Sequence, residues 1–180
     1  MSLTLSATDY KTQALTKAKS ILGEDKSNFA LPGLKMISIN VGVGKFESKE
    51  KQEIYNYLYK ITGQKPKQVK SRLSISNFKL RKGEINGIVV TLRGKKMYDF
   101  LLSLVYLALP VTRDFRGLKK NAFDKNYSSY SLGIPVCTIF PQVGFDSPVN
   151  FGMQINICFK TNTPDNRVLL ESFNFPFIKA

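Results

Sequence analysis

The chain has 180 residues, with 27 Lys and Arg against 13 Asp and Glu, and therefore a formal net charge of +14. A polyanion is the simplest partner for such an excess of positive charge, which repels itself in a compact domain. The sequence contains no His, which excludes a Ser-His-Asp triad, a Cys-His pair and any His-ligated metal within this chain.

Catalysis, cofactor binding and membrane insertion are not expected either. The carboxylates are scattered, and Glu47, Glu50 and Glu53 have the spacing of an exposed helical turn. We therefore predict no catalytic residue, no metal and no cofactor. The apolar stretch from Phe100 to Val111 is about half of a membrane span, and no lipidation motif is present. No membrane partner is expected.

The first 30 residues are predicted to form a helix over residues 8–22, followed by a loop. Ala14, Ala18 and Ile21 lie on one side of that helix, and Gly23 is a stop signal. The alternative is an organellar targeting segment, which is disfavoured because residues 8–22 contain Asp9 and no Arg. No apolar segment of a secretory signal is visible. Cys137 and Cys158 are far apart, as in a reduced protein with inert thiols.

Residues 35–44 are predicted to be a strand. Ile37, Ile39, Val41 and Val43 alternate with small or polar residues and point to the core. The strand ends in Gly-Val-Gly-Lys, which suggests a nucleotide loop, but Glu47 stands where GxGxxG requires its third glycine. The glycines either let a bulky partner approach the backbone or turn the chain.

A helix over residues 47–62 and a strongly basic segment follow. Gly63 should end the helix. Residues 54–83 contain eight Lys or Arg and no carboxylate, a composition that favours contact with nucleic acid over an ordinary solvated surface. Residues 73–81 are predicted to be a strand or an extended segment. We expect the loop over residues 71–83 to project from the domain, mobile in the free protein, with Asn77 and Phe78 near its middle.

The fold is organised around residues 84–118. Ile88, Val90 and Leu92 point to the core, while the opposite side of this strand is small and polar and ends at Arg93. A mostly buried helix follows from Gly94 and should end at Pro110.

The rest of the chain is predicted as a loop to Gly133, strands over residues 136–140 and 153–160, and a last helix capped by Thr163. Several strands share one pattern, apolar inward and small polar outward. The pattern predicts one two-layer α+β domain over residues 1–180. Its mainly antiparallel sheet has helices on one face and leaves the other face open for RNA.

Blocks of sequence in a fixed order carry a family resemblance. The most specific are Val90-Thr91-Leu92-Arg93-Gly94 and Arg113-Asp114-Phe115-Arg116-Gly117-Leu118, and others include Asn40-Val41-Gly42-Val43-Gly44 and Thr62-Gly63-Gln64-Lys65-Pro66. Over residues 31–179 the chain resembles the bacterial-type ribosomal large-subunit protein five family.

The resemblance implies a place in the central protuberance of the large subunit. Members bind 5S rRNA with the open sheet face, approach the elbow of the peptidyl-site (P-site) tRNA with the basic loop, and form a bridge to a small-subunit head protein. By motif position, Asn40, Gln64 and Thr91 would bind 5S rRNA. The full predicted rRNA-binding set is Lys35, Ser38, Asn40, Gly42, Gln64, Lys65, Lys67, Thr91, Arg93 and Lys95. The tRNA-proximal set is Asn77, Phe78, Lys79, Arg81 and Lys82, and a further basic cluster is Arg113, Arg116, Lys119 and Lys120.

The expected partners are therefore 5S rRNA, large-subunit rRNA, P-site tRNA and neighbouring ribosomal proteins, and no autonomous homo-oligomer is expected. The chain departs from the family pattern around residues 123–142, which concerns the bridge surface most. Its 21 Lys against 6 Arg and its 12 Asn suggest an AT-rich genome. Together with the altered segment, that bias is consistent with an organellar ribosome, mitochondrial rather than plastid, and the alternative is the bacterial cytoplasm. The alternative function is a structured-RNA-binding protein or RNA chaperone outside the ribosome.

Overall fold

One antiparallel sheet forms the centre of the molecule, with strand order β2-β3-β1-β5-β4. The computed structural model describes residues 6–22, 31–78, 80–112, 115–144 and 148–178. Its strands are β1 (Leu34–Gly42), β2 (Lys67–Lys70), β3 (Ile85–Leu92), β4 (Ser129–Ile134) and β5 (Met153–Phe159). Its helices are α1 (Ala7–Leu22), α2 (Ser48–Thr62), α3 (Gly94–Ser103), α4 (Leu109–Val111) and α5 (Asp165–Ser172).

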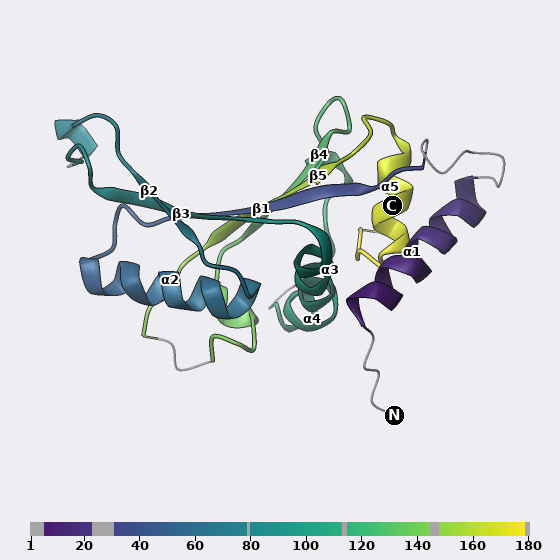
Figure 1. The fold of residues 1–180 in the computed structure, drawn as a ribbon, viewed down its shortest axis with the longest axis horizontal. Helices are drawn as coiled ribbons and strands as arrows, with labels where there is room; N and C mark the ends of the chain where they lie inside the picture. The colour runs from purple at the N-terminus through teal and green to yellow at the C-terminus, as the bar shows by residue number, and fades with distance from the viewer. Residues whose placement is uncertain (1–5, 23–30, 79, 113–114, 145–147, 179–180) are drawn as a thin grey trace.

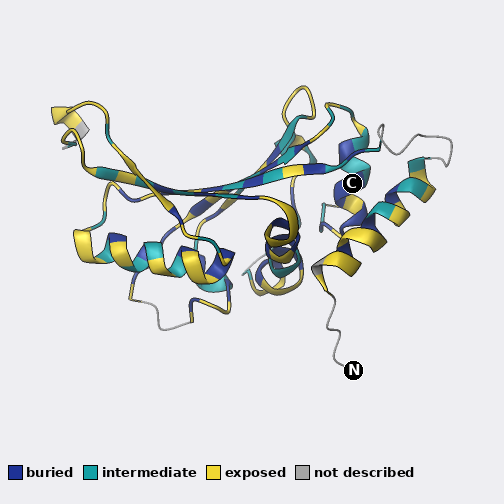
Figure 2. Cartoon of the chain, viewed as in Figure 1, coloured by how far each residue is buried: buried dark blue, intermediate teal, exposed yellow. Residues whose placement is uncertain are grey.

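The helices lie on one side of the sheet. Figure 1 shows α2, α3 and α4 beneath it, α1 and α5 at one end, and no described helix over the opposite face. This arrangement confirms the predicted α+β class with an open sheet face. Figure 2 shows buried and exposed positions alternating along the central strands, as expected when only one face is covered.

The core follows the period-two pattern of the sequence. Ile37, Ile39 and Ile88 are completely buried, as are the inward residues Ile155 and Ile157 of β5. They pack against the apolar side of α2 and α3, where Ile54, Leu58 and Leu101 are also completely buried, as is Leu104 directly after α3. The predicted inward faces of these strands are confirmed.

Helix α2 has the ends that its sequence predicts. Glu47 and Glu50 form a reciprocal capping box at its start. Gly63 ends the helix in the left-handed region, with φ of 62°, and its N–H donates to Tyr59 at 2.8 Å. A side chain at this φ would be strained, which explains the glycine.

Pro110 does not end the helix that starts at Gly94, contrary to the prediction. After α3 the chain winds as a π-helix over Leu104–Ala108 and continues as α4. Pro110 is the second residue of α4, which directly follows the π turn. The π turn replaces the usual hydrogen bond between residues four apart by one between residues five apart.

For residues 73–81 the sequence leaves a strand or an extended segment open, and the described residues form a projecting segment with one isolated bridge, Ile75–Leu80, rather than a strand. The strand that pairs with β3 is β2, Lys67–Lys70, an edge strand without apolar alternation. The strand prediction for residues 136–140 is wrong. Residues 136–140 contain a 3₁₀ turn, Cys137–Ile139, although Val136, Thr138 and Ile139 are β-branched. The predicted loop to Gly133 instead contains β4, whose residues Tyr130 and Ile134 are buried.

Helices α1 and α5 pack together at one end of the sheet. The Tyr10 hydroxyl donates to the Phe173 carbonyl at 2.6 Å, and the two rings are in contact. The predicted side-chain cap by Thr163 is wrong, because its buried hydroxyl makes no hydrogen bond. Asn166, fully buried, secures the start of α5 by donating to the carbonyls of Tyr127 and Thr161.

Candidate nucleic-acid interface

Two rows of uncharged residues cross the outer face of the sheet, and we call them the polar rows. Strand register places Thr91, Ser38, Asn156 and Ser131 side by side in the first row. It places Val89, Asn40, Gln154 and Gly133 side by side in the second, with Lys67 at the β2 end. No position in either row is a carboxylate. Apart from Val89, Gly133 and the terminal Lys67, the polar rows therefore form a surface of uncharged hydrogen-bonding side chains.

Side chains in the polar rows remain largely available. Asn40 is exposed and Ser38 is half-buried. Gln154 donates to the Asn156 side chain at 3.3 Å, which orders the two amides without using their full hydrogen-bonding capacity. An uncovered sheet with these groups can bind a polar partner through many short contacts.

Gly42 extends this surface beyond the polar rows. It lies within β1, opposite Gly87 of β3, and an added Cβ would meet no atom within 4 Å. Its φ is not positive, so this glycine is not required by a turn. Of the two explanations for the glycines, close approach of a partner fits Gly42 and turning the chain does not.

Gln64 and Thr91, which are 27 residues apart, meet at one corner of the outer face. The Gln64 side-chain amide donates to the Thr91 carbonyl at 3.0 Å. Nearby, the Lys96 ammonium donates to the Gly63 carbonyl at 2.9 Å. The first contact joins the end of α2 to the end of β3 and the second joins it to α3, so two of the residues implied by the resemblance are held together.

The predicted cations lie around the polar rows rather than among them. Five exposed residues make up this rim: Lys35, Lys65, Lys67, Arg93 and Lys95. Lys35 sits at an irregularity in the pairing of β1 with β5, which explains its exposure at an otherwise inward position. The Arg93 guanidinium contacts the Met36 sulfur at 3.5 Å. Within the described residues none of the five forms a salt bridge.

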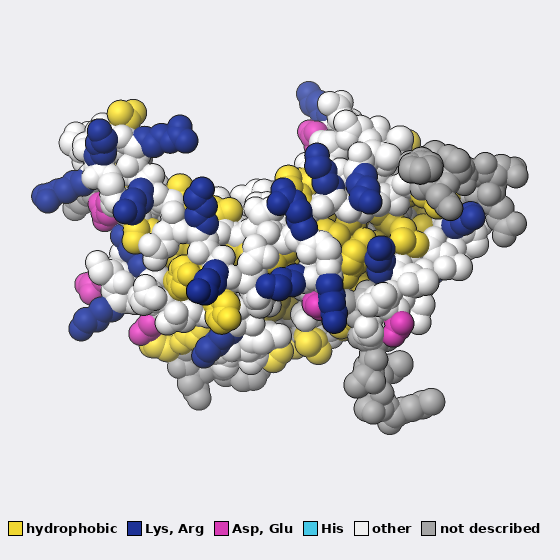
Figure 3. All heavy atoms as spheres, in the orientation of Figure 1, with side chains coloured by type: hydrophobic (Ala, Val, Ile, Leu, Met, Phe, Trp, Pro, Cys, Tyr) yellow, Lys and Arg dark blue, Asp and Glu magenta, His cyan; other side chains and the backbone are white. Residues whose placement is uncertain are grey.

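Residues 71–83, which we call the arm, connect β2 to β3 and rise from one end of the sheet (Figure 1). Ile75 and Leu80 exchange backbone hydrogen bonds across it, at 2.9 and 3.1 Å. Arg72, Arg81 and Lys82 are exposed, and Figure 3 shows Lys and Arg side chains gathered at this end of the molecule. Asn77 is exposed in a short 3₁₀ turn. Lys79 and the side chain of Phe78 lie outside the described residues.

The remaining basic cluster lies elsewhere. Arg116, Lys119 and Lys120 precede β4, the edge strand farthest from β2 in the sheet, and Arg113 lies outside the described residues. The Lys119 carbonyl accepts a hydrogen bond from the buried Tyr130 hydroxyl at 3.0 Å. The structure therefore places this cluster beside β4, at the opposite edge of the sheet from β2 and the arm.

Two features of this region were missed in the sequence. Ser131 joins a polar row because residues 129–134 are a strand, which their polar and aromatic composition conceals. Lys51 and Glu84 form a salt bridge at the base of the arm at 3.3 Å. Nothing in the sequence indicates that this lysine is buried or that these two residues meet.

The described residues contain neither a metal cluster nor a membrane-spanning helix. Among the described residues, no group of three or more Cys, Asp or Glu side chains could hold a metal ion. No described helix has the length and apolarity that a membrane span requires.

Comparison with known proteins identifies the family. Residues 28–81 match the family described as ribosomal protein L5, and residues 85–177 match the ribosomal L5P family C-terminus. The chain is 41% identical to the large ribosomal subunit protein uL5 of Wigglesworthia glossinidia brevipalpis over 175 residues, covering 94% of this chain and 97% of that protein. It is 43% identical over 170 residues to the protein of the same name in Spiroplasma kunkelii, with coverages of 91% and 94%. The chain therefore belongs to the ribosomal protein L5 family of the large ribosomal subunit.

Proposed function

We propose that the chain is a structural, RNA-binding constituent of the large ribosomal subunit whose outer sheet face binds 5S rRNA and adjacent large-subunit rRNA. The observation that carries the proposal is the pair of polar rows, which no described helix covers and which exposed cations border. Family membership supports it, since the relatives named above are large-subunit proteins.

The chemistry of the outer face suits structured RNA. An A-form helix presents a wide, shallow minor groove with 2′-hydroxyls, which is recognised through shape and short polar contacts. Ser38, Asn40 and Thr91 are short enough to let a backbone come close and to share hydrogen bonds with these hydroxyls. Lys67 and Arg93 lie at the border, where they can neutralise phosphates.

The arm is assigned a second RNA partner, the elbow of the P-site tRNA. It carries Arg72, Arg81 and Lys82 without any carboxylate over residues 71–83 and is separate from the polar rows. A further surface would contact a small-subunit head protein. Loss of charge at Arg81 and Lys82 should therefore affect tRNA and leave 5S rRNA binding in place.

Sedimentation distinguishes this function from an RNA chaperone outside the ribosome. Ribosomes from cells that express the tagged chain are washed in high salt and separated on a gradient. An integral constituent stays with the large subunit at constant stoichiometry, whereas a chaperone held by charge alone is released. Recovery of the washed chain only in the soluble fractions would contradict the proposal.

The compartment of that ribosome stays a prediction. The relatives named above are bacterial, and the Lys and Asn bias of the sequence indicates an AT-rich genome, which a bacterium or an organelle can have. Both settings fit the same interface.

A further inference from the structure

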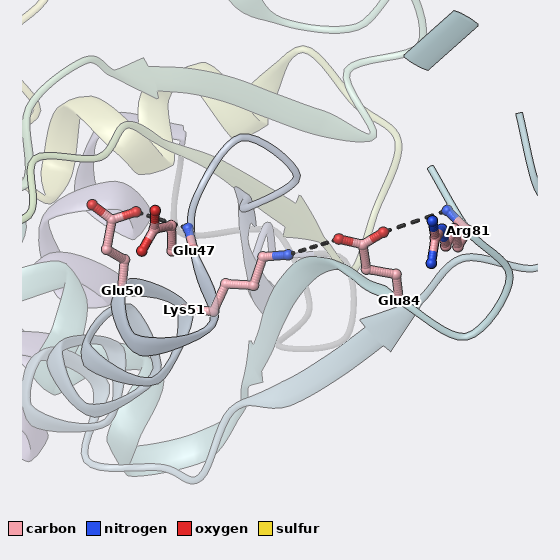
Figure 4. Close-up of polar contacts among 5 residues, drawn as sticks. All are labelled: Glu47, Glu50, Lys51, Arg81 and Glu84. Carbon is pink, nitrogen blue, oxygen red and sulfur yellow. Dashed lines mark hydrogen bonds and ion pairs between the residues drawn. The ribbon is translucent and has the colours of Figure 1, made fainter. Parts of the chain in front are cut away.

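Glu84 connects the arm to helix α2. It directly follows the arm and precedes β3, and each of its carboxylate oxygens accepts a separate contact. Oε1 accepts from the Lys51 ammonium at 3.3 Å, and Oε2 accepts from the Arg81 backbone N–H at 3.4 Å (Figure 4). One carboxylate therefore joins a residue of α2 to the returning side of the arm.

Lys51 is an unusual member of this group, because its side chain is only 9% exposed. A buried ammonium needs an anion or hydrogen-bond acceptors close by. Glu84 is the first carboxylate after the thirty-residue stretch from residue 54 to residue 83 that has none. The Arg81 N–H, followed by the Lys51 ammonium, holds the pKa of Glu84 below its usual value, so this side chain is ionised at neutral pH.

The other contacts at the base of the arm join its two sides to each other. Ser71 N–H donates to the Glu84 carbonyl at 2.8 Å, and Gly83 N–H donates to the Ser71 carbonyl at 2.9 Å. These bonds keep the two sides of the arm together, but they do not set its angle to α2. Among the described residues, the Lys51–Glu84 pair is the polar contact that joins this base to α2.

We propose that Glu84 is a positioning residue and that the chain of contacts Lys51–Glu84–Arg81, which we call the brace, fixes the direction in which the arm leaves the domain. The mutual repulsion of Arg72, Arg81 and Lys82 would otherwise favour many directions. A fixed direction reduces the conformational entropy that the arm loses when it binds its RNA partner. The identity of that partner rests on the proposed function, but the brace itself does not.

The brace predicts that the arm leaves the domain in one direction even in the free protein, whereas the sequence favours a mobile loop. The tip has local bonds, such as those between Ile75 and Leu80, and the Lys82 N–H donates to the Ser74 hydroxyl at 2.9 Å. None of these contacts reaches the body of the domain. Removing the brace should therefore change the direction of the whole arm while its internal structure persists.

Pulsed electron paramagnetic resonance, which measures the distance between two spin labels, tests this inference on the free chain. One spin label is attached at Asn56→Cys, on the exposed side of α2, and the other at Asn77→Cys, in the arm. The parent also carries Cys158→Ser, which removes the accessible native thiol. Cys137 can stay because it is fully buried. We expect one narrow distance distribution in this parent. Glu84→Ala and Lys51→Met should each widen it by about twofold through opening of the base.

Glu171→Ala is the matched control, because it removes the same charge from an exposed pair with Arg167 that lies in α5. It should leave the distribution unchanged. Lys51→Met retains the apolar stem, so it keeps the test usable if a smaller residue at 51 would unfold the chain. A parental distribution in either brace variant would overturn the proposal, since the brace needs both partners. No RNA is present, so this outcome is independent of the proposed function.

Discussion

Gly42 lies directly opposite Gly87 where β1 pairs with β3, so two glycines face each other on the outer side of the sheet. An added Cβ at Gly42 would have no atom within 4 Å, whereas one at Gly87 would make ordinary contact with the Val41 carbonyl at 3.6 Å. The free protein does not require the smallest residue at position 42. The space above Gly42 is therefore available to a partner.

Replacing Gly42 should separate folding from RNA binding. Gly42→Ala has room in the free chain and should leave the free energy of unfolding unchanged or raise it slightly, because alanine restricts the unfolded state. Gly42→Val should weaken 5S rRNA binding more than Gly42→Ala, since the larger side chain holds the RNA away from the backbone. Urea unfolding and fluorescence titration measure the two effects. If both variants bind 5S rRNA with the affinity of the parent, no RNA approaches this position.

The two faces of the sheet should respond differently to truncation. Asn40→Ala with Thr91→Ala removes two outer side chains and should weaken RNA binding while the melting temperature changes little. Val90 is 1% exposed, so Val90→Ala should cost on the order of 1 to 3 kcal/mol of stability through a cavity. Calorimetry and RNA titration of both variants give the comparison. Loss of folding in the double variant together with a silent Val90→Ala would mean that the assignment of the faces is reversed.

The arm should contribute to tRNA retention and not to 5S rRNA binding. Replacing Lys79, Arg81 and Lys82 with Gln removes three positive charges from the arm, whereas the polar rows keep all their contacts. Filter binding on assembled ribosomes should show faster release of P-site tRNA, with 5S rRNA affinity close to that of the parent. The matched control is Lys119→Gln with Lys120→Gln, at the opposite edge of the sheet. Collapse of 5S rRNA binding with normal tRNA retention would reverse the assignment of the two surfaces.

Tyr130 should make the stability of the chain sensitive to alkaline pH. Burial raises the pKa of its phenol to about 12 from 10.0, and the hydroxyl donates to the Lys119 carbonyl. A raised folded-state pKa means that its stabilising contribution is fully present below pH 10 and is lost as the pH rises toward 12. Tyr130→Phe should therefore cost about 1 kcal/mol at neutral pH. That difference should shrink in urea unfolding experiments above pH 10, and a pH-independent difference would contradict this assignment.

The central strands and the outer face could be predicted because their pattern depends on local alternation. Ile37 and Ile39 in β1, and Ile88 and Val90 in β3, mark one face as apolar, and the residues between them mark the other. A buried face imposes this period whatever the neighbouring strands are. The prediction of an open polar face followed from those residues alone.

The edges of the sheet could not be predicted in the same way. β2 consists of Lys, Gln, Val and Lys, all exposed, and its position is set by pairing with β3 rather than by its own pattern. Residues 136–140 carry β-branched side chains, but Pro135 precedes them and tertiary contacts make them a turn. The Lys51–Glu84 pair depends on the angle between α2 and the arm, which no spacing in the sequence encodes.

The native thiols provide the most direct test of RNA binding at the outer face. Cys158 is paired with Met36 beside the polar rows and is half-buried, whereas Cys137 is fully buried. Alkylation by a maleimide should therefore report on Cys158 alone in the folded chain. We predict that 5S rRNA slows this reaction in proportion to the fraction of protein bound, and that added salt restores the rate as it releases the RNA. Alkylation of Cys158 at the unprotected rate in a saturated complex would contradict the account, because the RNA would then occupy another face.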